Sequence, residues 1–430
     1  MKQLIKILKK IAPNDPNIYV IPAIEAMNHQ AYRLAVGYLR QAKKLAPQDP
    51  SIDVNMGLVL KRCCKYRWSK HFYQQAINKA PERLDAYIGL GMNAKILGEY
   101  ALSEGAYKKV LNLKSNYVSG HINLGICYLE QEKYQQGWIE YEWRLKLNAL
   151  KEIEKHYEKP RWQGESLQNK CLIIYAEQGF GDAIQFIRFV KKIQKMGGKV
   201  IVECQSTLCS LLQTMKGVDD TFPRFKSLPQ YDYYLPLLSL PYLLNLEKTD
   251  LHVETPYLQL STKARKQWAD IFSVYSNNYK IGICWAGNPQ HKYDQYRSIS
   301  PLLFKTLSKV NNKIKLFSLQ KGLAQKDCNV FEFIAVGDKF ETFMDTAACM
   351  AQLDLIISID SSVLHLSAAL DKPTWGLIAY LHDWRWGKHD RNTTIWYPSM
   401  RLYRQKQYQK WEDVFNMIKL DLAGMILDGQ

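Results

Sequence analysis

A glycine-rich turn followed by an acid is the first place where this sequence could do chemistry. The segment 177–182 reads EQGFGD, and Gly179 and Gly181 would permit a tight turn and the close approach of a ligand. Asp182 opens a predicted helix, where it could act as a general base or simply cap the helix. The turn is not a complete dinucleotide-binding fingerprint, because the third glycine is missing.

A second candidate lies near the carboxyl end of the chain. Asp360, Ser361 and Ser362 follow a run of β-branched residues, and His365 lies one turn into the next predicted helix. Hydroxyl groups and free backbone N–H groups at a helix N-terminus bind phosphates well. Ordinary helix capping, with His365 as a core histidine, is an equally compatible interpretation.

Both segments lie where a predicted strand gives way to a helix. Before a polar stretch at 276–278 the strand candidates are CLIIYAE (171–177), KVIVECQ (199–205) and, more weakly, DYYLPL (232–237), and residues 181–197 read as a helix. After it they are KIGICWAG (280–287), KLFSLQ (315–320), FEFIAVG (331–337), LDLIISID (353–360) and PTWGLIA (373–379). Strands alternating with helices predict two parallel sheets in two Rossmann-like lobes. Ligands of such sheets bind beyond the carboxyl ends of the strands.

The first third of the chain repeats itself every 34 residues. The repeating columns are Pro13, Pro47 and Pro81; Tyr32, Tyr66, Tyr100 and Tyr134; Gly57, Gly91 and Gly125; and Tyr73, Tyr107 and Tyr141. This pattern resembles an array of tetratricopeptide repeats, an α-solenoid that we expect to end near residue 147. Residues 1–12 would be the second helix of an incomplete first repeat. Such an array predicts a groove for a protein or peptide, although a spacer or dimerisation element remains an alternative.

Composition limits the remaining possibilities. The formal net charge is +17 and 47% of the residues are hydrophobic, which fits a folded protein attracted to phosphates, anionic lipid or acidic proteins. Lys6, Lys9 and Lys10 interrupt the apolar N-terminus, so we expect a cytoplasmic protein with little membrane contact. The nine cysteines form no Cys-x-x-Cys pair, which argues against a zinc site, and no nucleic-acid recognition motif accompanies the charge.

Five motifs in a fixed order carry a resemblance to a known family. They are YAEQGFGDAIQF (175–186), CWAGNPQHKYDQYRSI (284–299), FSLQKG (317–322), DTAACMAQLDLIISIDSSVLHLSAALDKP (345–373) and HDWRW (382–386). The sequence resembles bacterial heptosyltransferase-like enzymes of glycosyltransferase family 9, and more closely proteins that join tetratricopeptide repeats to such a domain. The resemblance implies a GT-B enzyme with repeats in 1–150, an acceptor-side Rossmann-like lobe in 151–275 and a donor-side lobe in 276–430.

The resemblance also implies roles for individual residues. The co-substrate would be a nucleotide-diphosphate sugar, used without a metal or other cofactor in an inverting transfer, with Asp182 as the general base. The donor-binding set would be Gly179, Gly181, Trp285, Asn288, Arg297, Gln320, Lys321, Asp345, Thr346, Asp360, Ser361, Ser362, His365, Asp383 and Arg385. A protein or peptide acceptor would bind through the repeats. The competing interpretation is a non-catalytic repeat scaffold with a degenerate transferase domain.

Overall fold

The computed structural model describes residues 12–428 except 225, 292 and 329–331. The chain divides after Leu147 into two compact units, one made of helices and one built around two sheets. The helix expected from residues 1–12 lies outside the described residues apart from its last position, so it stays a prediction.

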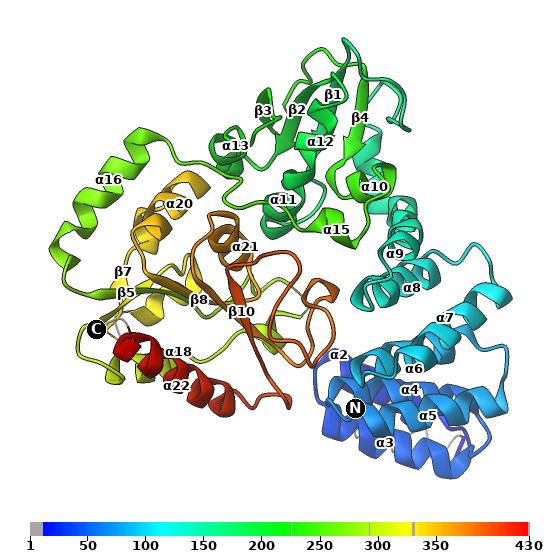
Figure 1. The fold of residues 1–430 in the computed structure, drawn as a ribbon. Helices are drawn as coiled ribbons and strands as arrows, with labels where there is room; N and C mark the ends of the chain where they lie inside the picture. Colours follow the sequence, from blue (N-terminus) through cyan, green and yellow to red (C-terminus); the bar gives the residue numbers. More distant parts are fainter. Residues whose placement is uncertain (1–11, 225, 292, 329–331, 429–430) are drawn as a thin grey trace. The chain divides into compact units, whose positions relative to one another are not determined.

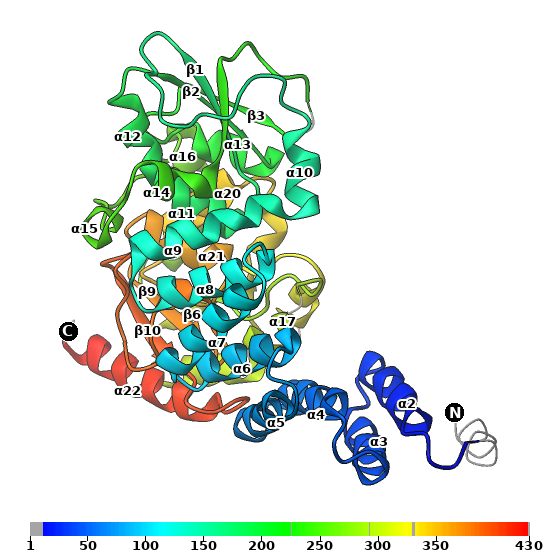
Figure 2. The ribbon, with the colours of Figure 1, turned by 90° about the vertical axis from the view of Figure 1, so that its right-hand side faces the viewer.

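The first unit is a series of helix pairs that repeats with the 34-residue period (Figure 2). The second helix of each pair begins at one member of the tyrosine column, from Tyr32 to Tyr134. The pairs are α2 (Asn17–Asn28) with α3 (Tyr32–Leu45), α4 (Pro50–Arg62) with α5 (Tyr66–Lys79), α6 (Leu84–Ile96) with α7 (Tyr100–Leu113), and α8 (Val118–Glu130) with α9 (Tyr134–Tyr141). A 3₁₀ turn, η1 (Glu142–Lys146), then closes the unit. The predicted α-solenoid is therefore confirmed.

At Gly57 and Gly91 a tyrosine ring of the paired helix fills the space where a Cβ would stand, whereas a Cβ on Gly125 would meet the backbone of Tyr141. A Cβ built on Gly57 would lie 2.9 Å from the Tyr73 ring, and one on Gly91 would lie 2.7 Å from the Tyr107 ring. Those distances are shorter than carbon atoms tolerate, so the two helices can approach this closely only where one residue lacks a side chain.

We predict that Gly91→Ala destabilises the repeat unit by about 1–3 kcal/mol, because the added methyl group overpacks the contact with Tyr107. Gly105→Ala is the matched control, since a Cβ there meets nothing within 4 Å and Gly105 lies exposed inside α7. That control should stabilise by about 0.5–1 kcal/mol. Urea unfolding of the full chain followed by circular dichroism measures both. Equal midpoints for the two variants would contradict the packing argument.

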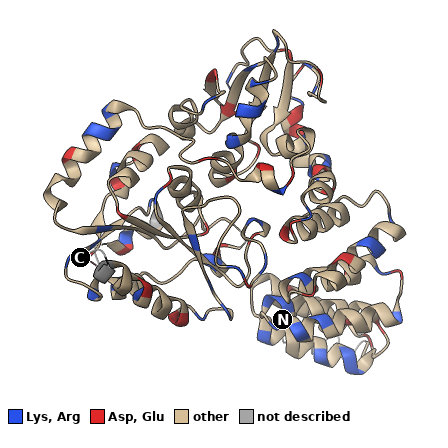
Figure 3. Ribbon diagram, viewed as in Figure 1, with Lys and Arg blue, Asp and Glu red and all other residues tan. Residues whose placement is uncertain are grey.

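Positive charge is concentrated in the early repeats, where blue segments outnumber red ones along α3 to α5 (Figure 3). One acid here is fully buried: Asp53 on α4 forms ion pairs with Lys43 on α3 and with Lys79 on α5. Each partner comes from a neighbouring helix, so the buried carboxylate ties consecutive helices together and needs both cations to offset its lost hydration.

The second unit contains two parallel sheets, which confirms the predicted pair of Rossmann-like lobes (Figure 1). The first sheet has the order β3-β2-β1-β4 and the second β10-β9-β8-β5-β6-β7. The first is built from β1 (Cys171–Tyr175), β2 (Lys199–Cys204), β3 (Asp220–Pro223) and β4 (Tyr233–Pro236). The second is built from β5 (Tyr279–Cys284), β6 (Ile314–Ser318), β7 (Ile334–Ala335), β8 (Leu355–Ile359), β9 (Thr374–Ile378) and β10 (Met400–Arg404).

Strand order decides where a ligand site can lie. In the second sheet the chain runs outward from β5 through β6 to β7 on one side, and from β8 through β9 to β10 on the other. The strands β5 and β8 are neighbours, with Cys284 paired to Ser358. Such a switch point leaves a crevice at the carboxyl ends of the two central strands. Asp360 and Ser361 follow β8 directly, so the topology brings them to this position.

Helices cover the sheets and carry the site residues at their first turns. They are α10 (Asn148–Glu154), α11 (Phe180–Phe186), α12 (Val190–Gln194), α13 (Ser206–Leu212), α14 (Leu240–Leu243), α15 (Lys248–Leu251), α16 (Thr262–Phe272), α17 (Asp294–Arg297), α18 (Pro301–Lys305), α20 (Phe343–Ala351), α21 (Ser362–Ala369) and α22 (Glu412–Asp428). Short 3₁₀ turns lie between them: η2 (Ile187–Phe189), η3 (Leu237–Ser239), η4 (Ser273–Tyr275), η5 (Thr306–Lys309), η6 (Leu323–Asp327), η7 (Gly337–Lys339) and η8 (Trp384–Trp386). The single helix predicted for 181–197 is instead α11, η2 and α12 in succession.

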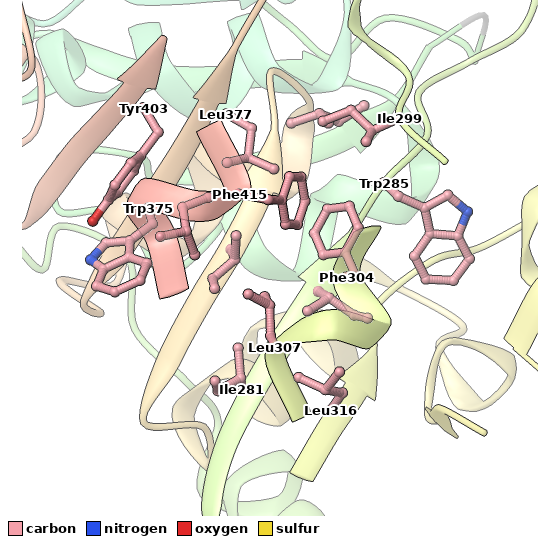
Figure 4. Close-up of a cluster of buried hydrophobic side chains, with 14 of the residues drawn as sticks. Ile281, Trp285, Ile299, Phe304, Leu307, Leu316, Trp375, Leu377, Tyr403 and Phe415 are labelled. Carbon is pink, nitrogen blue, oxygen red and sulfur yellow. The ribbon is translucent and has the colours of Figure 1, made fainter. Parts of the chain in front are cut away.

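An apolar core of the second lobe lies between its sheet and the final helix α22 (Figure 4). Ile281 and Leu316 come from central strands, Phe415 comes from α22, and Phe304 meets Phe415 edge to face. Burial of large aromatic and aliphatic side chains here fixes the strand ends that carry the candidate site.

Candidate active site

The first turns of three helices meet at the junction of the two lobes. A Cβ on Gly181, in the first turn of α11, would lie 2.8 Å from Cδ2 of His365 on α21. Phe180 of α11 also packs against Phe343, the first residue of α20, with ring centroids 4.9 Å apart. Each helix N-terminus carries a partial positive charge, so their meeting makes this junction favourable for an anion.

Of these three helix N-termini, that of α21 has backbone N–H groups that could bind a ligand. Its N-cap residue, Ser361, makes no side-chain cap; its hydroxyl lies 3.2 Å from Ser358 Oγ and 3.9 Å from Cys284 Sγ instead. Among the described residues, the N–H groups of Ser362 and Val363 have no hydrogen-bond acceptor. Backbone donors without partners at a switch point are groups that a phosphate would satisfy.

Asp182 has two structural partners. Its Oδ2 accepts a hydrogen bond from the Gly179 N–H at 3.0 Å, which caps α11, and its Oδ1 forms an ion pair with Arg385 of the second lobe. Arg385 also donates from Nε to Gln185 at 2.7 Å and from Nη1 to Asp383 at 2.8 Å. The carboxylate of one lobe is therefore oriented by a nearly buried cation of the other.

The surroundings alter the proton affinity of the acids. Burial raises the pKa of Asp182 above its usual value, although the charge of Arg385 opposes this shift. Burial, reinforced by Asp383, raises the pKa of Asp360 to about 6. Groups with shifted pKa values gather at functional sites, and a raised carboxylate pKa makes a stronger base near neutral pH.

Arg297 brings a further cation to the end of β8. Its Nη1 donates to the backbone carbonyl of Asp360 at 2.7 Å, and its Nε donates to Asp294 at 3.0 Å. Asp294 also accepts from the Ser298 hydroxyl at 2.8 Å, so both ends of the short helix α17 are tied together. The guanidinium is thereby placed beside the turn that opens α21.

Several predicted donor residues lie elsewhere or have structural partners. Trp285 is 1% exposed within the core of the second lobe, so its ring is not positioned to touch a ligand (Figure 4). The buried Gln320 side chain accepts from the Ala286 N–H and donates to the Ala286 carbonyl, both at 3.0 Å, which ties the end of β6 to the end of β5. Lys321 donates to the Phe340 carbonyl. Asn288 is exposed and accepts from the Gln290 N–H at 3.0 Å, which makes a local turn.

Three other predicted residues make local hydrogen bonds at the starts of helices. Asp345 accepts from the Thr342 N–H at 2.8 Å and caps α20, and Thr346 donates back to the Thr342 carbonyl at 3.4 Å. Asp383 accepts from the Arg385 N–H at 3.0 Å, besides its contact with the guanidinium. These contacts orient the helix starts, whether or not the same side chains touch a ligand.

Sequence reasoning missed the buried side chains around His365, which are Arg188, Tyr397 and Trp386. Arg188 is 1% exposed, and His365 hydrogen-bonds through Nδ1 to the Tyr397 hydroxyl at 2.9 Å. The His365 ring also stacks on Trp386 with centroids 5.3 Å apart. An arginine inside the apolar run FIRFV (186–190) was the available signal, because charged side chains are rarely buried without partners.

Comparison with known proteins identifies the family of the second lobe. Residues 247–413 match glycosyltransferase family 9 (heptosyltransferase), a match that contains β5 to β10 and the turn at Asp360. Residues 247–413 form a glycosyltransferase family 9 domain. The family 9 match begins after the first sheet, so Asp182 lies outside it, whereas Arg385 lies inside.

Protein FlbA of Caulobacter vibrioides is 23% identical over 311 residues, which cover 66% of this chain and 51% of FlbA. The chain thus spans about half the length of this curated relative. A crystal structure of MamA aligns with 36% of this chain and 88% of its own at 18% identity and a TM-score of 0.32. YrrB, titled a TPR protein with an unusual peptide-binding site, aligns with 34% of this chain and 74% of its own at 14% identity and a TM-score of 0.30.

Within the described ranges of the chain, no helix combines the length and the apolar character needed to cross a bilayer. No group of three or more His, Cys, Asp or Glu side chains in the same ranges is arranged to hold a metal ion.

We predict that Asp360→Asn stabilises the protein at pH 7 by up to about 2 kcal/mol. The folded protein holds the Asp360 proton more tightly than the unfolded chain, so wild-type stability is greatest at low pH and falls as the pH rises from about 4 to about 6. An asparagine is neutral at every pH, so the variant does not lose stability as the pH rises. The stability difference between the variant and the wild type should therefore be smaller at pH 4 than at pH 7.

Thermal unfolding at pH 4, 5.5 and 7 measures this difference, and the exposed Asp413→Asn is the control. A gain that is the same at all three pH values would show that burial of the Asp360 charge is not its cause.

Proposed function

We propose that this chain transfers a sugar from a nucleotide-diphosphate donor to an acceptor hydroxyl at the junction of its two lobes. The observation that carries the proposal is the α21 N-terminus, whose Ser362 and Val363 N–H groups lack acceptors among the described residues. Arg297 lies beside this turn, and the first turns of α11 and α20 add their dipoles. Together they would stabilise the diphosphate as negative charge develops on it.

Asp182 is the proposed general base. It would accept the proton of the acceptor hydroxyl while that oxygen attacks the anomeric carbon and the bond from this carbon to the diphosphate oxygen breaks. Attack from the face opposite the leaving group would invert the anomeric configuration, which NMR of the product can establish. Arg385 is ion-paired with Asp182, so donor phosphates would compete for this guanidinium and release the carboxylate.

We predict that Asp182→Asn lowers turnover by about 10²–10⁴-fold with little change in donor affinity. The amide keeps an oxygen that can cap α11 but cannot take up a proton. The donor is first chosen from UDP-, GDP-, ADP- and dTDP-sugars by thermal shift, and turnover is then followed by released nucleoside diphosphate.

Asp250→Asn is the matched control. Asp250 caps α15 by accepting from the Glu247 N–H at 3.0 Å and is ion-paired with Lys192, so it shares both structural roles of Asp182. If Asp182→Asn turns over as fast as the control, Asp182 is not the general base. Absence of binding and hydrolysis with every donor would favour a non-catalytic scaffold.

The acceptor side of the proposal rests on the repeats. Ile24, Leu58, Met92 and Ile126 follow one another at the 34-residue interval on the first helices of successive repeats. None of the four is buried, and Ile24 is 41% exposed. A ladder of apolar side chains across stacked repeats suits an extended peptide, so we propose a protein or peptide acceptor held by this face.

We predict that Leu58→Ser combined with Met92→Ser raises the KM for the acceptor about tenfold or more, since roughly 1.4 kcal/mol corresponds to tenfold. Hydrolysis of the donor by water should stay unchanged, because the site residues are untouched. Ile139→Ser is the control, since Ile139 is 55% exposed on a second helix, α9. An unchanged acceptor KM in the double variant would place acceptor recognition elsewhere.

A further inference from the structure

Arg188 is a buried cation of the first lobe and lies near His365, the histidine that is predicted to contact the sugar donor. Arg188 belongs to η2, yet it donates from Nη1 to the Trp396 carbonyl of the second lobe at 2.6 Å. Its Nη2 donates to the Tyr257 hydroxyl at 3.0 Å, and its Nε donates to the Gln185 carbonyl at 2.7 Å. A fully buried guanidinium needs such a set of acceptors to offset its lost hydration.

Aromatic rings enclose the same cation. The guanidinium carbon of Arg188 lies 4.8 Å from the centre of the Tyr257 ring and 4.4 Å from that of the Tyr397 ring. Tyr397 is fully buried, and its hydroxyl is hydrogen-bonded to His365 Nδ1 at 2.9 Å. The chain of contacts therefore runs from the first lobe through Tyr397 to His365.

The direction of these hydrogen bonds can be worked out from the donors and acceptors. An arginine only donates, and the Tyr257 hydroxyl, which accepts from Arg188, gives its own hydrogen to the Ile184 carbonyl at 2.9 Å. The positive charge of Arg188 favours the lone pairs of the Tyr397 oxygen facing the guanidinium and its hydrogen facing away. The Tyr397 hydroxyl also contacts the Tyr257 hydroxyl, but that oxygen already accepts from Arg188. His365 Nδ1 is then the acceptor left for the Tyr397 hydrogen.

The other ring nitrogen of His365 remains without a partner. His365 is 5% exposed, and among the described residues Nε2 makes no hydrogen bond. The ring lies against Gly181 of the first lobe and beside the N-terminus of α21, where the donor phosphates are proposed to bind. Burial, with Arg385 and Arg188 nearby, lowers the pKa of His365 to about 3, so the ring is neutral at physiological pH.

We propose that Tyr397, oriented by Arg188, is a positioning residue that holds His365 with its proton on Nε2 and so presents an N–H donor to the donor diphosphate. The inference rests on the proposed function for the ligand, but the protonation state of the ring does not depend on it. The opposite tautomer would present a lone pair to an anion, which is repulsive. Because Arg188 and His365 come from different lobes, the arrangement is complete only when the lobes are together.

The test begins with the wild-type full-length protein without ligand. The ¹³Cδ2 chemical shift of labelled histidine distinguishes the two neutral tautomers, and the His365 signal is assigned by its loss in His365→Asn. We expect a single signal of the Nε2–H form. A single signal of the Nδ1–H form would overturn the proposal without any variant having to fold.

Tyr397→Phe then removes the hydroxyl while keeping the ring. We expect His365 to lose its single Nε2–H signal, because Nδ1 is left buried without a partner. We also expect the affinity for the best-binding nucleoside diphosphate among UDP, GDP, ADP and dTDP to fall about tenfold, since losing such a hydrogen bond costs about 1–2 kcal/mol. Tyr403→Phe is the matched control, because the hydroxyl of this buried tyrosine donates to Asp421 at 2.7 Å and takes no part in these contacts; it should keep the wild-type His365 signal.

A His365 spectrum and a diphosphate affinity that both stay at wild-type values in Tyr397→Phe would contradict the positioning role. If none of the four diphosphates binds the wild type, the proposed function fails while the tautomer measurement still decides the proposal about Tyr397.

Discussion

The close approach of α11 to α21 is the contact on which the rest of the site depends. Gly181 touches the His365 ring where no side chain could fit, and this brings the first turn of one lobe against the first turn of the other. Three positively polarised helix ends then share one junction, with Phe180 packed on Phe343 beside them. The contacts that Asp182, Arg385 and Arg188 make across the lobes depend on this approach.

Charge at this junction is balanced across the lobes. Asp182 from the first lobe pairs with Arg385 from the second, while Arg188 from the first lobe lies among acceptors of both. Separating the lobes would therefore remove the pairing of Asp182 with Arg385 and one acceptor of Arg188. Under the proposed function, donor phosphates would enter this network and compete with Asp182 for Arg385.

Much of the fold could be predicted from local patterns. The 34-residue columns specify the helix pairs because Tyr107 must fill the space above Gly91, and apolar runs such as 353–360 specify the central strands because parallel strands are buried on both faces. The edge strands β3 and β10 were not predicted, since edge strands are short and mix polar with apolar residues.

The site was predictable in part. Residues adjacent in the sequence to a strand end, such as Asp360 and Ser361, follow from topology. Trp285 also follows a strand end, yet its ring turns into the core, because sequence position does not fix which face a side chain takes. The contacts of Arg188 with Trp396 and Tyr257 join segments 208 and 69 residues away, and no local pattern encodes such pairings.

The most direct test is a crystal structure of the full chain with the nucleoside diphosphate that stabilises it most. We expect diphosphate oxygens within hydrogen-bond distance of the Ser362 and Val363 backbone N–H groups, between α21 and α11. A diphosphate bound away from the α21 N-terminus, with those two N–H groups unoccupied, would contradict this expectation.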